Sequence, residues 1–136
     1  MTEQHLIIED YGWEVFIFYQ PDKDDIDGIS SVLEMVGCPE ENIRKAEENM
    51  LLVNTGFTYS NYTERASVMV IGRTTSLAEL WSTVDHEKGH LVQHISEAFG
   101  LDEYGEAREY LAGDIACGMY PYIRVMLCPC SYKDRP

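Results

Sequence analysis

Three histidines and a glutamate lie close together in DHEKGHLVQH, residues 85–94. In a helix, residues four apart share one face, so the imidazoles of His86 and His90 can converge on one metal ion. A catalytic zinc site needs neutral imidazole ligands, a third protein ligand and an open position for water. Glu87 adjoins the first histidine and can act as general base toward that water. The spacing predicts metal-assisted hydrolysis, and the alternative is a polar, solvated helix face.

The string His86-Glu87-Lys88-Gly89-His90 matches the HExxH pattern of zinc metallopeptidases at every defined position. The chain thereby resembles zincins, and among them the gluzincins, whose third zinc ligand is a glutamate on the following helix. The resemblance implies bound zinc, with Glu106 as the third ligand and Glu109, one turn further on, as the alternative. A short turn before an antiparallel helix would bring one of these carboxylates back beside His90.

Glu106 is preferred because it begins the string Glu-x-x-x-Tyr-Leu-x-Gly, which ends at Gly113. That string resembles the glutamate-bearing helix of short peptidases associated with phages and mobile elements. The likeness covers about residues 67–118 and implies a minimal zincin fold that acts on a peptide or protein. It implies that zinc polarises the scissile carbonyl, while Glu87 takes a proton from water and delivers it to the leaving amine.

In that family the strand before the active-site helix often holds extended peptide by strand addition. Residues 66–72 are therefore the candidate substrate edge. The residues expected to form it are Ser67, Val68, Met69 and Val70. The negative oxygen that forms on the scissile carbonyl needs a hydrogen-bond donor. Three tyrosines are possible donors, and their positions in the sequence favour none of them. These are Tyr59, Tyr62 and Tyr110.

His94 extends the histidine series by one more turn. The outer two histidines of the series would be about 12 Å apart along a straight helix, too far for all three to bind one zinc. We therefore expect His94 to be a residue of the second shell or the cleft, or a satisfied polar group. Asp85, Asp114 and Tyr110 are further candidates near the ligands, and either aspartate could orient a ligand imidazole.

One long helix should carry the motif. Ser76 is a potential N-cap with Glu79 three residues later, and apolar residues recur at helical spacing until Gly100. Gly89 lies inside this helix at a cost of roughly 1 kcal/mol relative to alanine. That cost calls for a reason, such as tight packing of Gly89 against another element.

The remaining elements predict an α+β fold, with a small antiparallel or mixed sheet packed against the HExxH helix and the glutamate-bearing helix after it. Residues 5–8 and 13–19 are expected to form a hairpin, and residues 26–36 a helix. A charged helix follows from Pro39 to about Asn49. Three strands are predicted in LLVNTG, FTYSNY and ASVMVIGR, and a last helix from near Asp102 or Glu103.

The chain has 136 residues, 45% of them hydrophobic, which suits a single folded domain over residues 1–136. Its formal net charge of −14 would repel nucleic acids and anionic membranes. No segment reads as a membrane span or an export signal, so we expect a soluble, cytoplasmic protein. The four cysteines should then be reduced, although Cys128 and Cys130 form a CxC pair that could bind a soft metal.

Two other functions compete with hydrolysis. The acidic clusters at residues 22–27 and 40–48 suit a non-catalytic protein that covers a basic surface on a partner, if the acids form one continuous stripe. A zincin fold that keeps its metal for structure alone is the second. Four protein ligands and no open position would distinguish that case.

Overall fold

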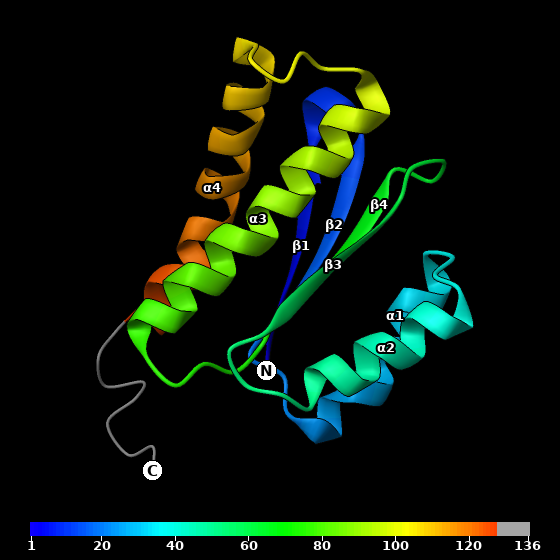
Figure 1. The fold of residues 1–136 in the computed structure, drawn as a ribbon, viewed down its shortest axis with the longest axis vertical. Helices are drawn as coiled ribbons and strands as arrows, with labels where there is room; N and C mark the ends of the chain where they lie inside the picture. The colour runs from blue at the N-terminus through cyan, green and yellow to red at the C-terminus, as the bar shows by residue number, and fades with distance from the viewer. Residues whose placement is uncertain (128–136) are drawn as a thin grey trace.

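The computed structural model describes residues 1–127. Its core is a four-stranded sheet in the order β1-β2-β4-β3 (Figure 1). Strands β1 (Thr2–Ile8) and β2 (Trp13–Tyr19) pair antiparallel, and β2 pairs parallel with β4 (Ala66–Ile71). Strand β3 (Gly56–Asn61) pairs antiparallel with β4. This confirms the predicted mixed α+β fold. Cys128 and Cys130 lie outside the described residues.

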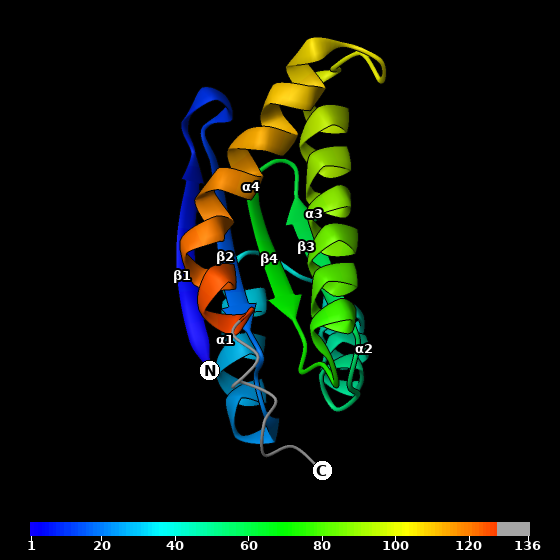
Figure 2. The ribbon, with the colours of Figure 1, turned by 90° about the vertical axis from the view of Figure 1, so that its left-hand side faces the viewer.

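Helices cover both faces of the sheet (Figures 1 and 2). One face carries α1 (Ile26–Met35) and α2 (Glu40–Met50), and the other carries α3 (Leu77–Phe99) and α4 (Glu106–Met126). Alternate strand residues supply the two cores, because neighbouring side chains in a strand point to opposite faces. Met69 packs under α3 and α4, whereas Val68 and Val70 pack under α1 and α2. In the helices of residues 1–127, none is long and apolar enough to cross a membrane.

The predicted hairpin and the motif helix are both confirmed. A single 3-10 turn from Glu9 to Tyr11 joins β1 to β2, and Gly12 closes it in the left-handed region at φ 57°. The Ser76 side chain accepts a hydrogen bond from the Glu79 amide at 3.1 Å and so caps α3. At the other end Gly100 takes φ 64°, which ends the helix where the sequence predicted.

Two predicted boundaries are wrong. The segment Leu51–Val53 forms no strand, because α2 runs to Met50 and ends in a turn bonded from the Leu52 amide to the Asn49 carbonyl at 3.0 Å. Helix α4 begins at Glu106 and not near Asp102, since residues 102–105 form a turn of their own.

Helix α4 is fixed over the first strand of the sheet, away from β3 (Figure 2). Gly118 of α4 packs directly on Leu6 of β1: a Cβ added to Gly118 would lie 2.6 Å from Leu6 Cδ1, so a larger residue would require the Leu6 side chain to shift. The Gln4 side-chain amide donates to the Gly118 carbonyl at 2.7 Å, and the Tyr19 hydroxyl donates to Gln4 at 2.6 Å. These contacts join α4 to β1, on the side of α3 away from β3.

Gly89 is exposed, and an added Cβ would meet nothing within 4 Å, so the prediction of tight packing there is wrong. Gly89→Ala should therefore raise the free energy of unfolding by about 1 kcal/mol, because alanine loses less backbone entropy in a helix. Urea unfolding of the metal-free protein measures this. A loss of stability would show that Gly89 has a contact absent from this arrangement.

Candidate metal and catalytic site

The two motif histidines face each other across one turn of α3. The Nε2 atoms of His86 and His90 are 3.1 Å apart, and the rings are nearly perpendicular at 85°. Two imidazoles bound to tetrahedral zinc at 2.0–2.1 Å would hold these nitrogens about 3.3 Å apart. Without an ion, one Nε2 must carry a proton and donate it to the other. The pair therefore fits a shared metal ion with little movement.

The Glu87 side chain is buried where α3 packs against β3, and it is 3% exposed. The Thr58 hydroxyl donates to Glu87 Oε1 at 2.9 Å. Burial raises the pKa of the Glu87 carboxyl, while the Thr58 bond and the neighbouring His86 and His90 act in the opposite direction. A carboxylate with a raised pKa and a fixed orientation is suited to accept a proton.

A polar pocket of about 290 Å³ opens beside His86 and Glu87. Helix α3 contributes Glu79, Ser82 and Thr83 to its wall, and the entry into β3 contributes Asn54, Thr55 and Gly56. A Cβ at Gly56 would lie 2.5 Å from the Val70 carbonyl oxygen and 3.0 Å from Glu87 Cγ. Glycine at this position therefore lets β3 pass close to the buried carboxylate.

His94 is tied to the sheet by a chain of hydrogen bonds. The Trp13 indole donates to Ser67 Oγ at 2.8 Å, Ser67 Oγ lies 2.7 Å from Ser60 Oγ, and Ser60 Oγ lies 2.7 Å from His94 Nδ1. An indole only donates, so the buried Ser67 hydroxyl keeps a partner if it donates to Ser60. Ser60 then donates to Nδ1, which leaves the proton of His94 on Nε2. This assignment makes His94 a hydrogen-bond donor and not a metal ligand.

The electrostatic surroundings of His94 agree with a neutral ring. Burial lowers the pKa of its imidazole, His90 lowers it further, and Glu97 opposes them. The Tyr62 ring lies 6.0 Å from the His94 ring, and its hydroxyl donates to Glu97 Oε2 at 2.8 Å. The Tyr59 hydroxyl instead bonds to the Gly37 carbonyl at 3.3 Å. Of the three tyrosines considered as donors, Tyr62 is thus the one beside the histidines.

The structure does not bring Glu106 or Glu109 to the histidines. Both are exposed in the first turn of α4, level with the end of α3, whereas His90 lies nine residues earlier, about 13 Å along the helix. In residues 1–127, no three His, Cys, Asp or Glu side chains form a group that could hold a metal. The prediction that α4 supplies the third ligand is therefore wrong for this arrangement.

The reason lies in which face of α3 meets α4. A narrow apolar pocket of about 170 Å³ separates these helices, and α3 lines it with Trp81, Val84, Asp85 and Lys88. The histidines and Glu87 lie on the side toward β3 instead. Asp85 is 3.9 Å from Lys88 Nζ, and Asp114 and Tyr110 are exposed on α4. None of these three has a described contact with His86 or His90.

The predicted substrate edge is also wrong. Ser67, Val68, Met69 and Val70 belong to β4, an inner strand that pairs with β2 on one side and β3 on the other. No described strand pairs with the outer edge of β3. Because the chain runs from β3 into β4 through a tight antiparallel connection and β4 then pairs with β2, β3 takes the outer place.

The outer edge of β3 presents free backbone groups at two residues that the sequence analysis did not select, Thr58 and Ser60. The Gly72 amide donates to the Thr55 carbonyl at 2.9 Å, which marks residues 55 and 72 as a hydrogen-bonded pair. Antiparallel pairs alternate, so Thr58 and Ser60 direct their N–H and C=O groups outward. Their side chains are the ones that contact Glu87 and His94. The alternation of aromatic and polar residues in FTYSNY, residues 57–62, was the sequence signal that could have identified Thr58 and Ser60.

The site thus combines a pair of converging imidazoles, a buried carboxylate one residue away and an open strand edge bonded to the same helix. Comparison with protein-family models, with curated proteins and with solved structures finds no match for this chain. What the site does must accordingly be argued from its own geometry.

Proposed function

We propose that this chain is a zinc-dependent peptidase that hydrolyses a peptide held along the outer edge of β3, with Glu87 as general base. The observation that carries the proposal is the 3.1 Å separation of the His86 and His90 Nε2 atoms. That separation is close to the spacing that a tetrahedral zinc would require of two imidazole ligands. The HExxH order of these residues supports the same chemistry.

His86 and His90 would hold the ion, and bound zinc would supply a Lewis acid that polarises a peptide carbonyl and acidifies water. The described residues offer two ligands, so the remaining positions are left to water, substrate or a further donor. Glu87 takes the proton of the attacking water and passes it to the leaving amine. The Thr58 hydroxyl holds the carboxylate in place for both transfers.

The two competing functions have less support. Exposed acidic residues occur on both helical layers, for example Glu40 on α2 and Glu109 on α4, so they are not confined to the stripe that a basic partner would need. A purely structural zinc needs four protein ligands, and in residues 1–127 only His86 and His90 converge, which is one ligand short of a catalytic zinc site and two short of a structural one.

Metal analysis tests the proposal. The purified protein, loaded with zinc and then dialysed, should retain about one equivalent, and His86→Ala should lose it because one imidazole alone holds zinc weakly. His5→Ala is the matched control, since His5 is an exposed histidine bonded to Glu14 in the hairpin. A wild-type protein that takes up no zinc, or equal uptake by His86→Ala, would refute the metal site.

A further inference from the structure

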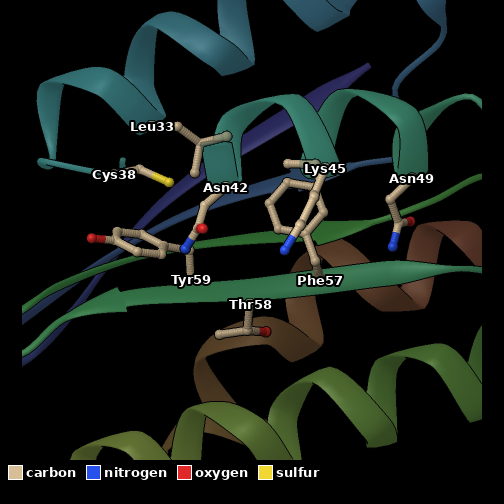
Figure 3. Close-up of a pocket in the computed structure, with 9 residues that line it drawn as sticks. Leu33, Cys38, Asn42, Lys45, Asn49, Phe57, Thr58 and Tyr59 are labelled. Carbon is tan, nitrogen blue, oxygen red and sulfur yellow. The ribbon is translucent and has the colours of Figure 1, made fainter. Parts of the chain in front are cut away.

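A third pocket, of about 320 Å³, lies on the opposite face of β3 from the histidines (Figure 3). Phe57 and Tyr59 rise from β3 into the space beneath α2, while the Thr58 side chain points the other way, toward α3. Leu33 and Cys38 form part of its apolar wall. Consecutive β3 residues therefore serve two different sites, one on each face of the strand.

A peptide that pairs with the outer edge of β3 would reach both sites. Its backbone would bond to the outward N–H and C=O groups of Thr58 and Ser60. In an antiparallel pair, residues directly opposite each other place their side chains on the same face. The peptide residues opposite Thr58 and Ser60 would thus face the histidines, and the residue opposite Tyr59 would enter the pocket beneath α2.

The charge of this pocket differs from that of its neighbours. Among the described residues that line it, Lys45 carries the only full charge, and Asn42 and Asn49 add amides. Lys45 Nζ is 3.8 Å from Glu41 Oε1, and both side chains are 74% exposed, so this pair holds the ammonium weakly. The pocket beside His86 contains Glu79 and Glu87 instead.

We propose that the pocket between α2 and β3 binds an acidic side chain of an extended peptide, at the position opposite Tyr59. The methylene stem of a glutamate would lie against Phe57, and its carboxylate would meet Lys45 and Asn42. The inference rests on the proposed function only in taking that peptide as the substrate. The proposed substrates are extended peptides with a glutamate opposite Tyr59. The peptide residues on either side of this glutamate would face the histidines.

Binding can be tested without cleavage in the Glu87→Gln variant. The probes are two acetylated, amidated peptides of β-branched residues that differ only in a central glutamate or lysine. Amide hydrogen exchange should show Thr58 and Ser60 exchanging fast in the free protein, with Phe57 and Tyr59 already protected by β4. The glutamate peptide should slow exchange at Thr58 and Ser60 and should bind about two- to fivefold more tightly than the lysine peptide.

Lys45→Glu should remove or reverse this preference, whereas Arg44→Glu should retain it. The two changes are equal in charge and adjacent on α2, but Arg44 lines a different pocket, with Glu34, Glu40 and Glu47. Equal binding of both peptides, or equal effects of both variants, would overturn the acidic pocket. Slowed exchange with a preference for the glutamate peptide, but no zinc-dependent cleavage by the wild type, would support the pocket and refute the peptidase. Zinc-dependent cleavage of peptides that leave Thr58 and Ser60 unprotected would support the peptidase and refute both the pocket and the β3 edge as the place where the substrate binds.

Discussion

Glu87→Gln should lower the rate of zinc-dependent peptide hydrolysis by about 10²- to 10⁴-fold, the usual contribution of a general base. Glutamine has the shape of glutamate and can still accept the hydrogen bond from Thr58, but it cannot take a proton. Zinc uptake should be unchanged, because His86 and His90 remain. Rates measured on a defined peptide mixture by mass spectrometry, with zinc content determined in parallel, provide the measurement.

Glu79→Gln is the matched control for this variant. Glu79 lines the same pocket as Glu87 and belongs to the same helix, but it is exposed and lies two turns before Glu87. Its substitution should leave the hydrolysis rate within about twofold of the wild type. If both variants lose activity alike, the rate depends on the negative electrostatic potential of the pocket, and Glu87 is not the general base.

Glu87→Gln should also stabilise the metal-free fold. Burial raises the pKa of Glu87 in the folded state, so the folded protein holds this proton more tightly than the unfolded chain does. The ionised form therefore costs stability above the folded pKa, and the cost disappears below the unfolded pKa. Melting temperatures across pH should show Glu87→Gln above the wild type at neutral pH and equal to it in acid.

The second large effect is expected at Gly56. Gly56→Ala should reduce the free energy of unfolding by about 1–3 kcal/mol, because the new Cβ would lie 2.5 Å from the Val70 carbonyl oxygen. The backbone of β3 must move to relieve this contact, and Glu87 Cγ, 3.0 Å from the same Cβ, would move with it. Hydrolysis should fall along with stability.

Urea unfolding and peptide hydrolysis measure the two effects of Gly56→Ala. Gly113→Ala is the control, since Gly113 lies in α4 and an added Cβ would meet nothing within 4 Å. Unchanged stability together with unchanged hydrolysis in Gly56→Ala would show that β3 does not need to pass so close to α3, which would contradict the described site.

The amino-acid sequence by itself determined the motif helix and the geometry within it. Ser76 and Gly100 delimit α3, and the four-residue spacing of His86 and His90 allows their imidazoles to converge, as they do with Nε2 atoms 3.1 Å apart. Both are local properties, since capping and helical periodicity depend on residues within a few turns. For the same reason the hairpin of β1 and β2 could be predicted from its short turn.

Only the tertiary structure decided what surrounds the motif. Glu106 follows α3 by a short connection, yet α4 packs over β1, with Gly118 against Leu6, on the far side of α3 from the histidines. Strand order placed β3, and not β4, at the edge. These outcomes depend on contacts between residues far apart in the chain, such as Gln4 with Gly118. Local periodicity carries no information about such contacts, so spacing could predict the two imidazoles but not their neighbours.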